Sequence, residues 1–285
     1  MNIELEKIPC FGVAGNFTGH LEQAGEARDF SKIETKEANA PKAMFPTYIP
    51  GGKDPTPEFL TVYPFDDKKI LFPKDEEKLQ IEPECALICS ASWNNGKLVD
   101  LVPELFGASN DCSIRNPKIA EGKIIKISLK KNWGKSTKGL SSNLIAINSF
   151  KEKGILDSYR IASFLVRDSN VFDYGVDSQI KDYSYFYRKL IDWCIAKINT
   201  QNDTGPQENI LSYLNSMSSL PEKIMISVGA TRYTEFGETN FLKNGDHSVV
   251  VLYPETMSHQ EIADLVKKND FSRKDISVLC QKIMM

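Results

Sequence analysis

Three carboxylates between residues 81 and 115 have the types and spacing of a site for a divalent cation. Glu82 and Glu84 lie two residues apart at the start of a short apolar run, 85–91, that is typical of a buried strand. In an extended chain, residues i and i+2 point to the same face, roughly 6.6 Å apart, so both carboxylates can reach one ion. Asp111 follows a Gly and several small residues, where the chain can bring in a third oxygen. Oxygen ligands alone select a hard cation, so we expect Mg²⁺ or Mn²⁺, with Ca²⁺ as the alternative.

A solvated strand face is the other interpretation of the same pattern. Charged residues are common at strand ends, and alternating glutamates on one strand more often face water than a metal. The spacing of Glu82 and Glu84 alone does not decide between the two interpretations.

Three short motifs, in their order and separation, resemble those of the fumarylacetoacetate hydrolase superfamily. They are Glu82-Pro-Glu84-Cys-Ala-Leu, Gly107-Ala-Ser-Asn110-Asp111-Cys-Ser-Ile-Arg115 and Trp133-Gly134-Lys135-Ser136. The superfamily has a Glu-x-Glu-Leu-Ala strand, a Gly-Tyr-x-x-x-Asn-Asp-x-x-Ala-Arg turn and a Gly-Lys-Ser/Gly-Phe segment. The similarity spans about residues 10–254 and is weak over 151–222, as in a divergent member. It implies that Glu82, Glu84 and Asp111 hold the metal and that Lys135 faces it.

A histidine near the start of the chain matches another motif of this superfamily. The segment Gly15-Asn16-Phe17-Thr18-Gly19-His20 resembles Gly-x-Asn-Tyr-x-x-His-x-x-Glu, whose His and Glu act as an acid/base pair that positions a water. Gln23 stands where the superfamily has this Glu. An amide can orient an imidazole by a hydrogen bond but cannot stabilise its charged form by charge. Glu22 or Glu26 is therefore the alternative partner for His20.

The resemblance also assigns roles to individual side chains. The two catalytic residues it implies are His20 and Lys135. The substrate-binding residues that we infer from it are Asn16, Arg115 and Thr231.

These side chains need a sheet to hold them, and apolar runs along the chain predict one. Residues 9–20 are expected to form a strand that opens into a loop, and further strands are expected at 59–63, 85–91, 144–147, 157–167, 223–231 and 248–253. The resemblance implies an α+β fold that is predominantly β, namely a β-roll with a mixed sheet and peripheral helices.

Helical periodicity is confined to two parts of the chain. Residues 183–198 and 208–217 predict helices within an insert at about 170–220, and residues 258–268 and 272–283 predict two more. We therefore expect a single catalytic domain of the superfamily type at 1–254 and a C-terminal helical extension at 255–285.

Composition limits the class of protein. The 285 residues are 41% hydrophobic, which suffices for a proper core, and the net charge of −3 argues against a nucleic-acid partner. The six cysteines form no Cys-x-x-Cys pair and are expected to be reduced. No charged-then-apolar leader opens the chain and no apolar run approaches 18 residues, so a soluble cytoplasmic protein without a membrane partner is expected.

Two functions fit these observations. The first is a metal-dependent enzyme, a homodimer as the resemblance implies, that acts on a small oxo-acid by carbon-carbon hydrolysis, decarboxylation or isomerisation. All three reactions pass through an enolate that a metal stabilises as a Lewis acid. The second is a metal- or ligand-binding protein that keeps the fold without turnover, because Gln23, Thr47 and Ala230 stand at three pocket positions where the superfamily has other polar or charged groups.

Overall fold

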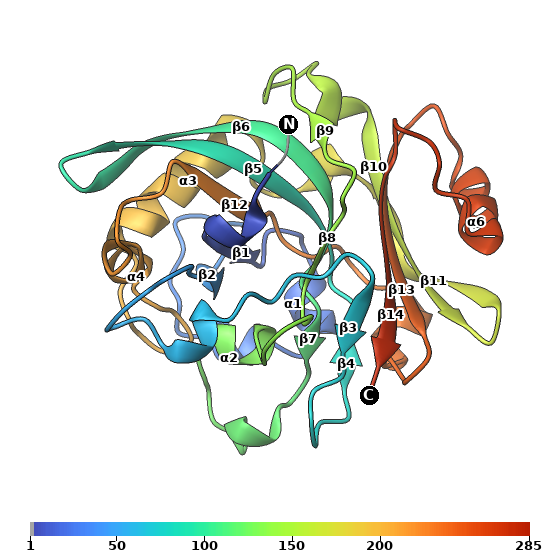
Figure 1. Ribbon diagram of the computed structural model, residues 1–285, viewed down its shortest axis with the longest axis horizontal. Coiled ribbons are helices and arrows are strands. Elements are labelled where there is room, and N and C mark those ends of the chain that lie inside the picture. Colours follow the sequence, from blue (N-terminus) through green and yellow to red (C-terminus); the bar gives the residue numbers. More distant parts are fainter. Residues whose placement is uncertain (1–2) are drawn as a thin grey trace.

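The computed structural model describes residues 3–285, and two β-sheets that pack against each other dominate it (Figure 1). The seven-stranded sheet has the order β2 (Ala43–Tyr48), β1 (Cys10–Ala14), β12 (Lys223–Ser227), β5 (Pro83–Asn94), β6 (Lys97–Asn110) and β8 (Gly139–Leu140), with β9 (Ile145–Ala146) also paired to β6. The five-stranded sheet has the order β11 (Asn170–Gln179), β10 (Tyr159–Arg167), β13 (His247–Pro254), β14 (Ser277–Met284) and β3 (Lys69–Leu71). Each sheet contains one parallel pair, β1 with β12 and β14 with β3, so both are mixed.

A long hairpin of β5 and β6 forms the main part of the first sheet. Its turn is formed by Asn95 and Gly96, whose φ angles of 48° and 74° are those that a tight two-residue hairpin turn requires. The first seven residues of β5 are buried on both faces, whereas the half near the turn is mostly accessible. The buried half, which begins with Pro83 and Glu84, lies under the second sheet.

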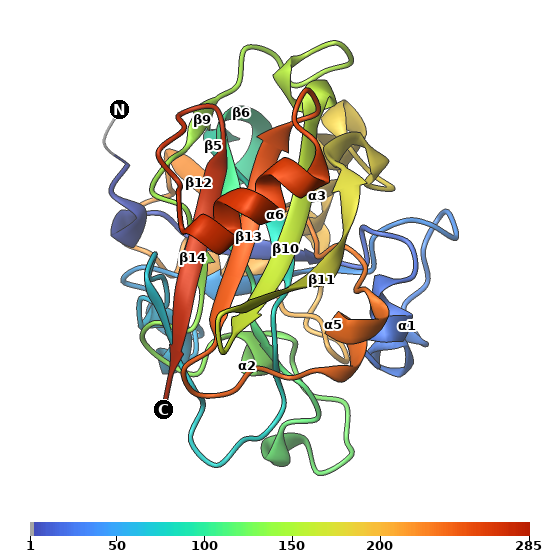
Figure 2. The ribbon, with the colours of Figure 1, turned by 90° about the vertical axis from the view of Figure 1, so that its right-hand side faces the viewer.

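The five-stranded sheet has an apolar layer on each side. Its inner face packs on β5 and β6, and α6 (His259–Lys268) lies across its outer face (Figure 2). Ser258 and Glu261 form a capping box at the start of α6, and Asn269 ends the helix in the left-handed conformation. Ile262 and Val266 pack with the apolar side chains of β10 and β13. The expected helix at 258–268 is thereby confirmed.

The second expected C-terminal helix is wrong. Residues 277–284 form β14, which pairs with both β13 and β3. Burial alternates along this strand, with Ser277, Leu279, Gln281 and Ile283 facing inward. The apolar positions that suggested a helix also satisfy this period of two, and the open edge of β13 decides between the two structures.

The insert between β11 and β12 holds two helices, α3 (Tyr187–Thr200) and α4 (Ile210–Asn215), close to the expected positions. Its N-terminal limit differs, because 170–179 form β11 of the outer sheet. The strand expected at 59–63 is also wrong, since a 3₁₀ turn, η3 (Glu58–Thr61), stands there. Leu60 is fully buried by this turn.

The remaining elements are short. They are the two-stranded sheet of β4 (Leu79–Gln80) and β7 (Ser113–Ile114), the helices α1 (His20–Gln23), α2 (Ser128–Lys131) and α5 (Glu235–Thr239), and the 3₁₀ turns η1 (Leu5–Lys7), η2 (Ala27–Phe30), η4 (Lys118–Ala120), η5 (Ile155–Ser158) and η6 (Ile180–Asp182). Among them, α1 and α2 bring ionisable side chains to the candidate site.

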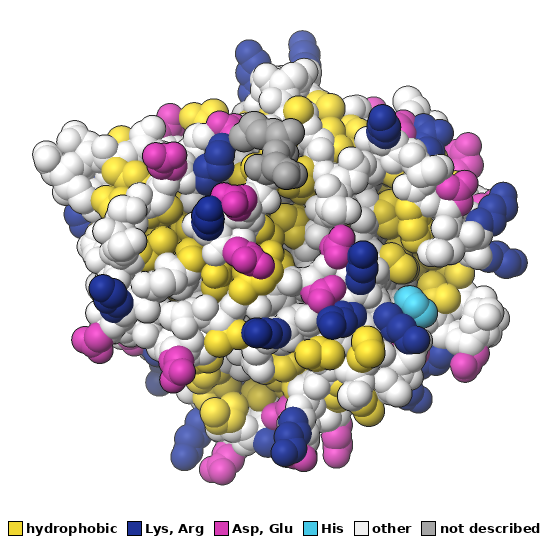
Figure 3. Space-filling model, viewed as in Figure 1, with side chains coloured by type: hydrophobic (Ala, Val, Ile, Leu, Met, Phe, Trp, Pro, Cys, Tyr) yellow, Lys and Arg dark blue, Asp and Glu magenta, His cyan; other side chains and the backbone are white. Residues whose placement is uncertain are grey.

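Basic and acidic side chains are interspersed on the face in Figure 3. None of the helices in the described part of the chain has the length and apolar character of a membrane span. The six cysteines are free, and all but Cys280 are buried.

Candidate metal centre

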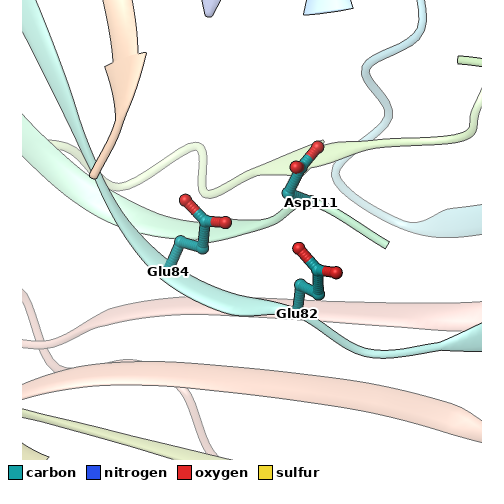
Figure 4. A group of neighbouring side chains, drawn as sticks. All are labelled: Glu82, Glu84 and Asp111. Atoms are coloured by element: carbon teal, nitrogen blue, oxygen red, sulfur yellow. The ribbon is translucent and has the colours of Figure 1, made fainter. Parts of the chain in front are cut away.

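The pairing of β5 with β6 brings the three predicted carboxylates together. Pro83 pairs with Asn110, so Glu82 and Asp111 lie opposite each other, and the Asp111 backbone N–H donates to the Glu82 carbonyl at 3.0 Å. One ligand atom from each of Glu82, Glu84 and Asp111 lies within 4.8 Å of the others. All three side chains are buried, and they extend from the two neighbouring strands into one space (Figure 4). This burial rules out a solvated strand face.

Two lysines and an arginine surround the carboxylates. The Lys131 ammonium, at the end of α2, contacts Glu82 Oε2 and lies 3.1 Å from Asp111 Oδ2. Lys138 Nζ lies 3.1 Å from Asp111 Oδ1. Arg115 donates to Glu82 Oε1 at 2.6 Å and to Glu26 Oε1 at 2.7 Å. Four acidic side chains, Glu26 included, and three basic side chains thus form one buried cluster.

The lysine expected to face the metal is not at the site. Lys135 is exposed, whereas Lys131 and Lys138 are almost completely buried against the carboxylates. The correction has a structural cause, since the single turn of α2 ends at Lys131 and the chain then leaves the site until Lys138. Seven lysines lie between residues 118 and 138, and only the position of α2 identifies the buried ones.

The charges in the cluster perturb one another strongly. Burial by itself raises the pKa of Glu82, but Lys131 and Arg115 outweigh it and hold this pKa well below its usual range. Burial, together with the neighbouring charges of Asp111 and Glu82, raises the pKa of Glu84. A bound cation would therefore stabilise the charged form of Glu84.

The donor set fits a hard divalent cation. All three ligand side chains offer oxygen, the donor that Mg²⁺ and Mn²⁺ prefer. Asp111 Oδ2 is buried and accepts no hydrogen bond within residues 3–285, although Lys131 Nζ is near it. Glu84 accepts one hydrogen bond, from the Gly229 N–H to Oε2 at 2.9 Å. Lone pairs of Asp111 and Glu84 thus remain available to an ion.

Gly229 has a specific role in this geometry. Its φ angle is 116°, and a Cβ at this position would lie 3.1 Å from Val13 O and from Asn16 Cβ. A glycine allows the chain after β12 to turn closely enough for its N–H to reach Glu84. A side chain here would be crowded by these two atoms and would adopt a backbone conformation that is strained for L-residues.

His20 faces the carboxylate cluster from α1. Gly19 precedes it with a φ of 86°, and the imidazole Nδ1 lies 2.8 Å from the Thr231 carbonyl. Because a carbonyl only accepts, Nδ1 carries the proton and Nε2 of the neutral ring is left with a lone pair. Burial lowers the pKa of His20 to about 4 against the opposing charge of Glu82, so the ring is neutral near pH 7.

Gln23, which stands where the superfamily has the glutamate partner of the histidine, is not the partner of His20. The Gln23 amide exchanges hydrogen bonds with the Tyr233 backbone, at 2.9 and 3.1 Å. Glu22 is exposed, whereas Glu26 is buried and lines the same cavity as His20. Of the two alternative partners, Glu26 is the one that lies close enough to influence the imidazole, and its carboxylate is held by Arg115.

The three residues expected to bind substrate are all buried. Asn16 donates both amide hydrogens to backbone carbonyls, of Tyr185 and Val228, and accepts from the Tyr185 N–H. Arg115 binds Glu82 and Glu26, and Thr231 contacts His20 through its carbonyl. In this conformation, Asn16 and Arg115 therefore connect parts of the site to one another.

A small cavity joins His20 to the metal centre. Its walls include His20, Glu82, Glu84, Lys131 and Glu26, and its volume is about 10 Å³. This is roughly the room that one water molecule needs. Sequence reasoning had no signal for Lys131, Lys138 or the Tyr233 hydroxyl that also binds Arg115, because their approach depends on loops between elements.

The fold is that of fumarylacetoacetate hydrolase family proteins. The chain is similar to 2-keto-3-deoxy-D-arabinonate dehydratase complexed with magnesium and 2,5-dioxopentanoate, with a TM-score of 0.54 and 14% identity over 98% of this chain and 73% of that one. It is equally similar to yeast ynq8, a fumarylacetoacetate hydrolase family protein, with a TM-score of 0.54 and 13% identity over 98% and 94% of the two chains. A third similar structure, Cg1458 with inhibitor, has a TM-score of 0.52 and 14% identity over 97% and 76%.

A family model matches residues 26–283, and the chain belongs to that family, described as a family of unknown function (DUF5718). No curated protein matches the sequence. The predicted relationship to the fumarylacetoacetate hydrolase superfamily is confirmed at the level of the fold.

Proposed function

We propose that this protein is a Mg²⁺- or Mn²⁺-dependent enzyme that acts on a small oxo-acid. The observation that carries the proposal is the buried Glu82, Glu84 and Asp111 cluster, whose two glutamates line one cavity with His20 and Lys131. The dehydratase of the same fold, in its complex with magnesium and 2,5-dioxopentanoate, supports this substrate class.

Each side chain has a role in such a reaction. Glu82, Glu84 and Asp111 would hold the cation, which supplies Lewis-acid polarisation of a carbonyl oxygen. Lys131 would place a positive charge beside an acid substrate, and the neutral His20 would accept a proton at Nε2. Carbon-carbon hydrolysis, decarboxylation and isomerisation all require this combination of a base and a stabilised negative charge.

Substrate entry requires part of the cavity wall to move. An oxo-acid is larger than the space of about 10 Å³ beside the metal centre. The segment from His20 to Glu26 forms one wall and is held by the hydrogen bonds of Gln23 and the ion pair of Glu26. Displacement of this segment would admit a ligand, and its return would exclude water.

A calorimetric titration tests the metal centre. Mn²⁺ and Mg²⁺, each with and without oxalate as a chelating oxo-acid mimic, are titrated into metal-free wild type and into Glu84→Gln. We expect wild type to bind and oxalate to tighten binding, and we expect Glu84→Gln to weaken it by at least about tenfold, since first ligands matter at least as much as the groups that orient them. Glu22→Gln, an exposed glutamate in α1, is the matched control and should behave as wild type. Absence of binding to wild type contradicts the proposal.

The alternative is a binding protein without turnover. The position of Gln23, which is engaged with the Tyr233 backbone and does not assist His20, favours it. His20→Ala separates the two functions after a screen with acylpyruvates and oxaloacetate. An enzyme should retain metal binding and lose turnover in this variant, whereas metal and oxalate binding without turnover in wild type would favour the binding protein.

A further inference from the structure

Each carboxylate of the metal centre has one oxygen held by a donor of the protein. Arg115 binds Glu82 Oε1 at 2.6 Å, and the Gly229 N–H binds Glu84 Oε2 at 2.9 Å. Lys138 Nζ lies 3.1 Å from Asp111 Oδ1. Lys131 also contacts Glu82 Oε2, whereas Asp111 Oδ2 and the second oxygen of Glu84 accept no hydrogen bond within residues 3–285. Glu84 and Asp111 therefore each offer one oxygen in place of a chelating carboxylate.

Lys138 is the unusual member of this set. It is 1% exposed, and its ammonium contacts the Cys112 carbonyl and Asp111 and lies 5.3 Å from the centre of the Trp133 ring. Pairing of β8 with β6 places Gly139 opposite Asn110, which fixes Lys138 beside Asp111. Lys131 lines the cavity with His20, whereas Lys138 lies on the Cys112 side of Asp111. Its contacts therefore suit control of Asp111 better than contact with a substrate.

A purely structural role gives a poor account of this lysine. Burial of an ammonium costs several kcal/mol before its ion pair forms, and an apolar side chain of similar length would avoid that cost. The positive charge also lies near a site that is expected to take a dication, which weakens binding of every such ion. A lysine at this position is explained if it weakens the binding of some metal ions more than that of others.

Ions differ in how they use carboxylates. Ca²⁺ takes six to eight oxygens in flexible geometry and often binds both oxygens of one carboxylate, whereas Mg²⁺ requires near-octahedral single contacts at about 2.0–2.1 Å. We propose that Lys138 occupies Asp111 Oδ1 so that Asp111 offers one oxygen, and that this selects Mg²⁺ or Mn²⁺ over Ca²⁺. The inference rests on the proposed metal-dependent function and adds a residue that determines which ion is taken.

Metal-binding calorimetry on the apo protein tests the inference without any activity assay. Mg²⁺, Mn²⁺ and Ca²⁺ are titrated separately into wild type and Lys138→Met, whose side chain is of similar length and uncharged. The readout is the ratio of the Ca²⁺ and Mg²⁺ dissociation constants, because loss of a positive charge affects two dications alike and cancels in the ratio. We expect wild type to bind Mg²⁺ at least as tightly as Ca²⁺. We expect Lys138→Met to shift the ratio about tenfold toward Ca²⁺, because loss of a group that orients a metal ligand changes affinity by at least about this factor.

Two further variants complete the design. Lys135→Met removes an exposed lysine three residues away and should leave the ratio unchanged, and Lys138→Arg keeps a charged donor and should retain the Mg²⁺ preference. Tighter binding of Ca²⁺ than of Mg²⁺ by wild type would overturn the inference even if no Lys138 variant folded. An unchanged ratio in a folded Lys138→Met would also overturn it while leaving the metal centre intact. No binding of any ion to wild type would overturn both this inference and the proposed function.

Discussion

The two sheets of this protein are stabilised by different interactions. At the buried end of the β5–β6 hairpin, the first sheet buries Glu82, Glu84 and Asp111 with Arg115, Lys131 and Lys138. The outer sheet buries Ile262, Val266 and the apolar side chains of β10 and β13, and its ion pair between Arg160 and Asp177 remains partly accessible. A buried ion cluster is a poor way to stabilise a fold, whereas apolar packing is a good one. The difference supports the proposed chemical role of the charged side chains in the first sheet.

Removal of Arg115 should have the largest effect. Arg115→Met leaves Glu26 and Glu82 buried without their shared partner, and such a loss costs about 3–5 kcal/mol of unfolding free energy. Arg160→Met in the outer sheet is the matched control, with an expected cost below about 1 kcal/mol because its ion pair is partly solvated. Urea denaturation of both metal-free variants measures the contrast, and equal costs would contradict the comparison.

Glu208 is a buried carboxylate outside the site, and no basic side chain within residues 3–285 forms an ion pair with it. It therefore shows what burial does to a carboxylate that lacks a charged partner. Glu208 accepts a hydrogen bond from Ser128 of α2 at 2.6 Å, and burial raises its pKa to about 7. A raised carboxyl pKa stabilises the protein at low pH, and that contribution disappears as the pH rises through about 7. Between pH 5 and pH 8, wild type should lose about 3 kcal/mol of stability relative to Glu208→Gln. Urea denaturation at both pH values measures it, and a constant difference would refute the expectation.

The smallest effect is expected in the apolar layer of the outer sheet. Ile262→Val removes one buried methylene between α6 and the sheet and should cost about 1 kcal/mol at every pH. Because no ionisable group of the metal centre lies in this layer, Mn²⁺ affinity should stay the same. Thermal denaturation measures the loss of stability, and calorimetry measures the Mn²⁺ affinity. An altered Mn²⁺ affinity would show that the two sheets are coupled.

Sequence reasoning succeeded where local pattern and function coincide. The spacing of Glu82 and Glu84 placed both carboxylates on one strand face, and the resemblance of the three motifs to those of the superfamily added Asp111, so the cluster was predicted from the two together. The sheet-rich fold was also predictable from short apolar runs.

Prediction failed where distant elements decide. Lys131 and Lys135 are the same residue type in the same basic stretch, so the sequence does not distinguish them. Only the end of α2 brings Lys131 to the carboxylates. Likewise, the C-terminal residues 277–284 carry apolar side chains that suit a helix or a strand, and the free edges of β13 and β3 select the strand. Both outcomes depend on contacts between residues far apart in the chain.

The place of β14 has a consequence for how the protein is made. Gln281 accepts a hydrogen bond from Asn110, the neighbour of Asp111, and donates to the carbonyls of Asp66 and Lys138. On the ribosome, a nascent chain that has not yet delivered β14 lacks these bonds, although all the ionisable groups of the cluster have already emerged. The Asn110 side chain and the backbone at Lys138 should therefore reach their final positions only once β14 has paired, and a ribosome-stalled chain ending before 277 should hold the neighbouring Asp111 less firmly.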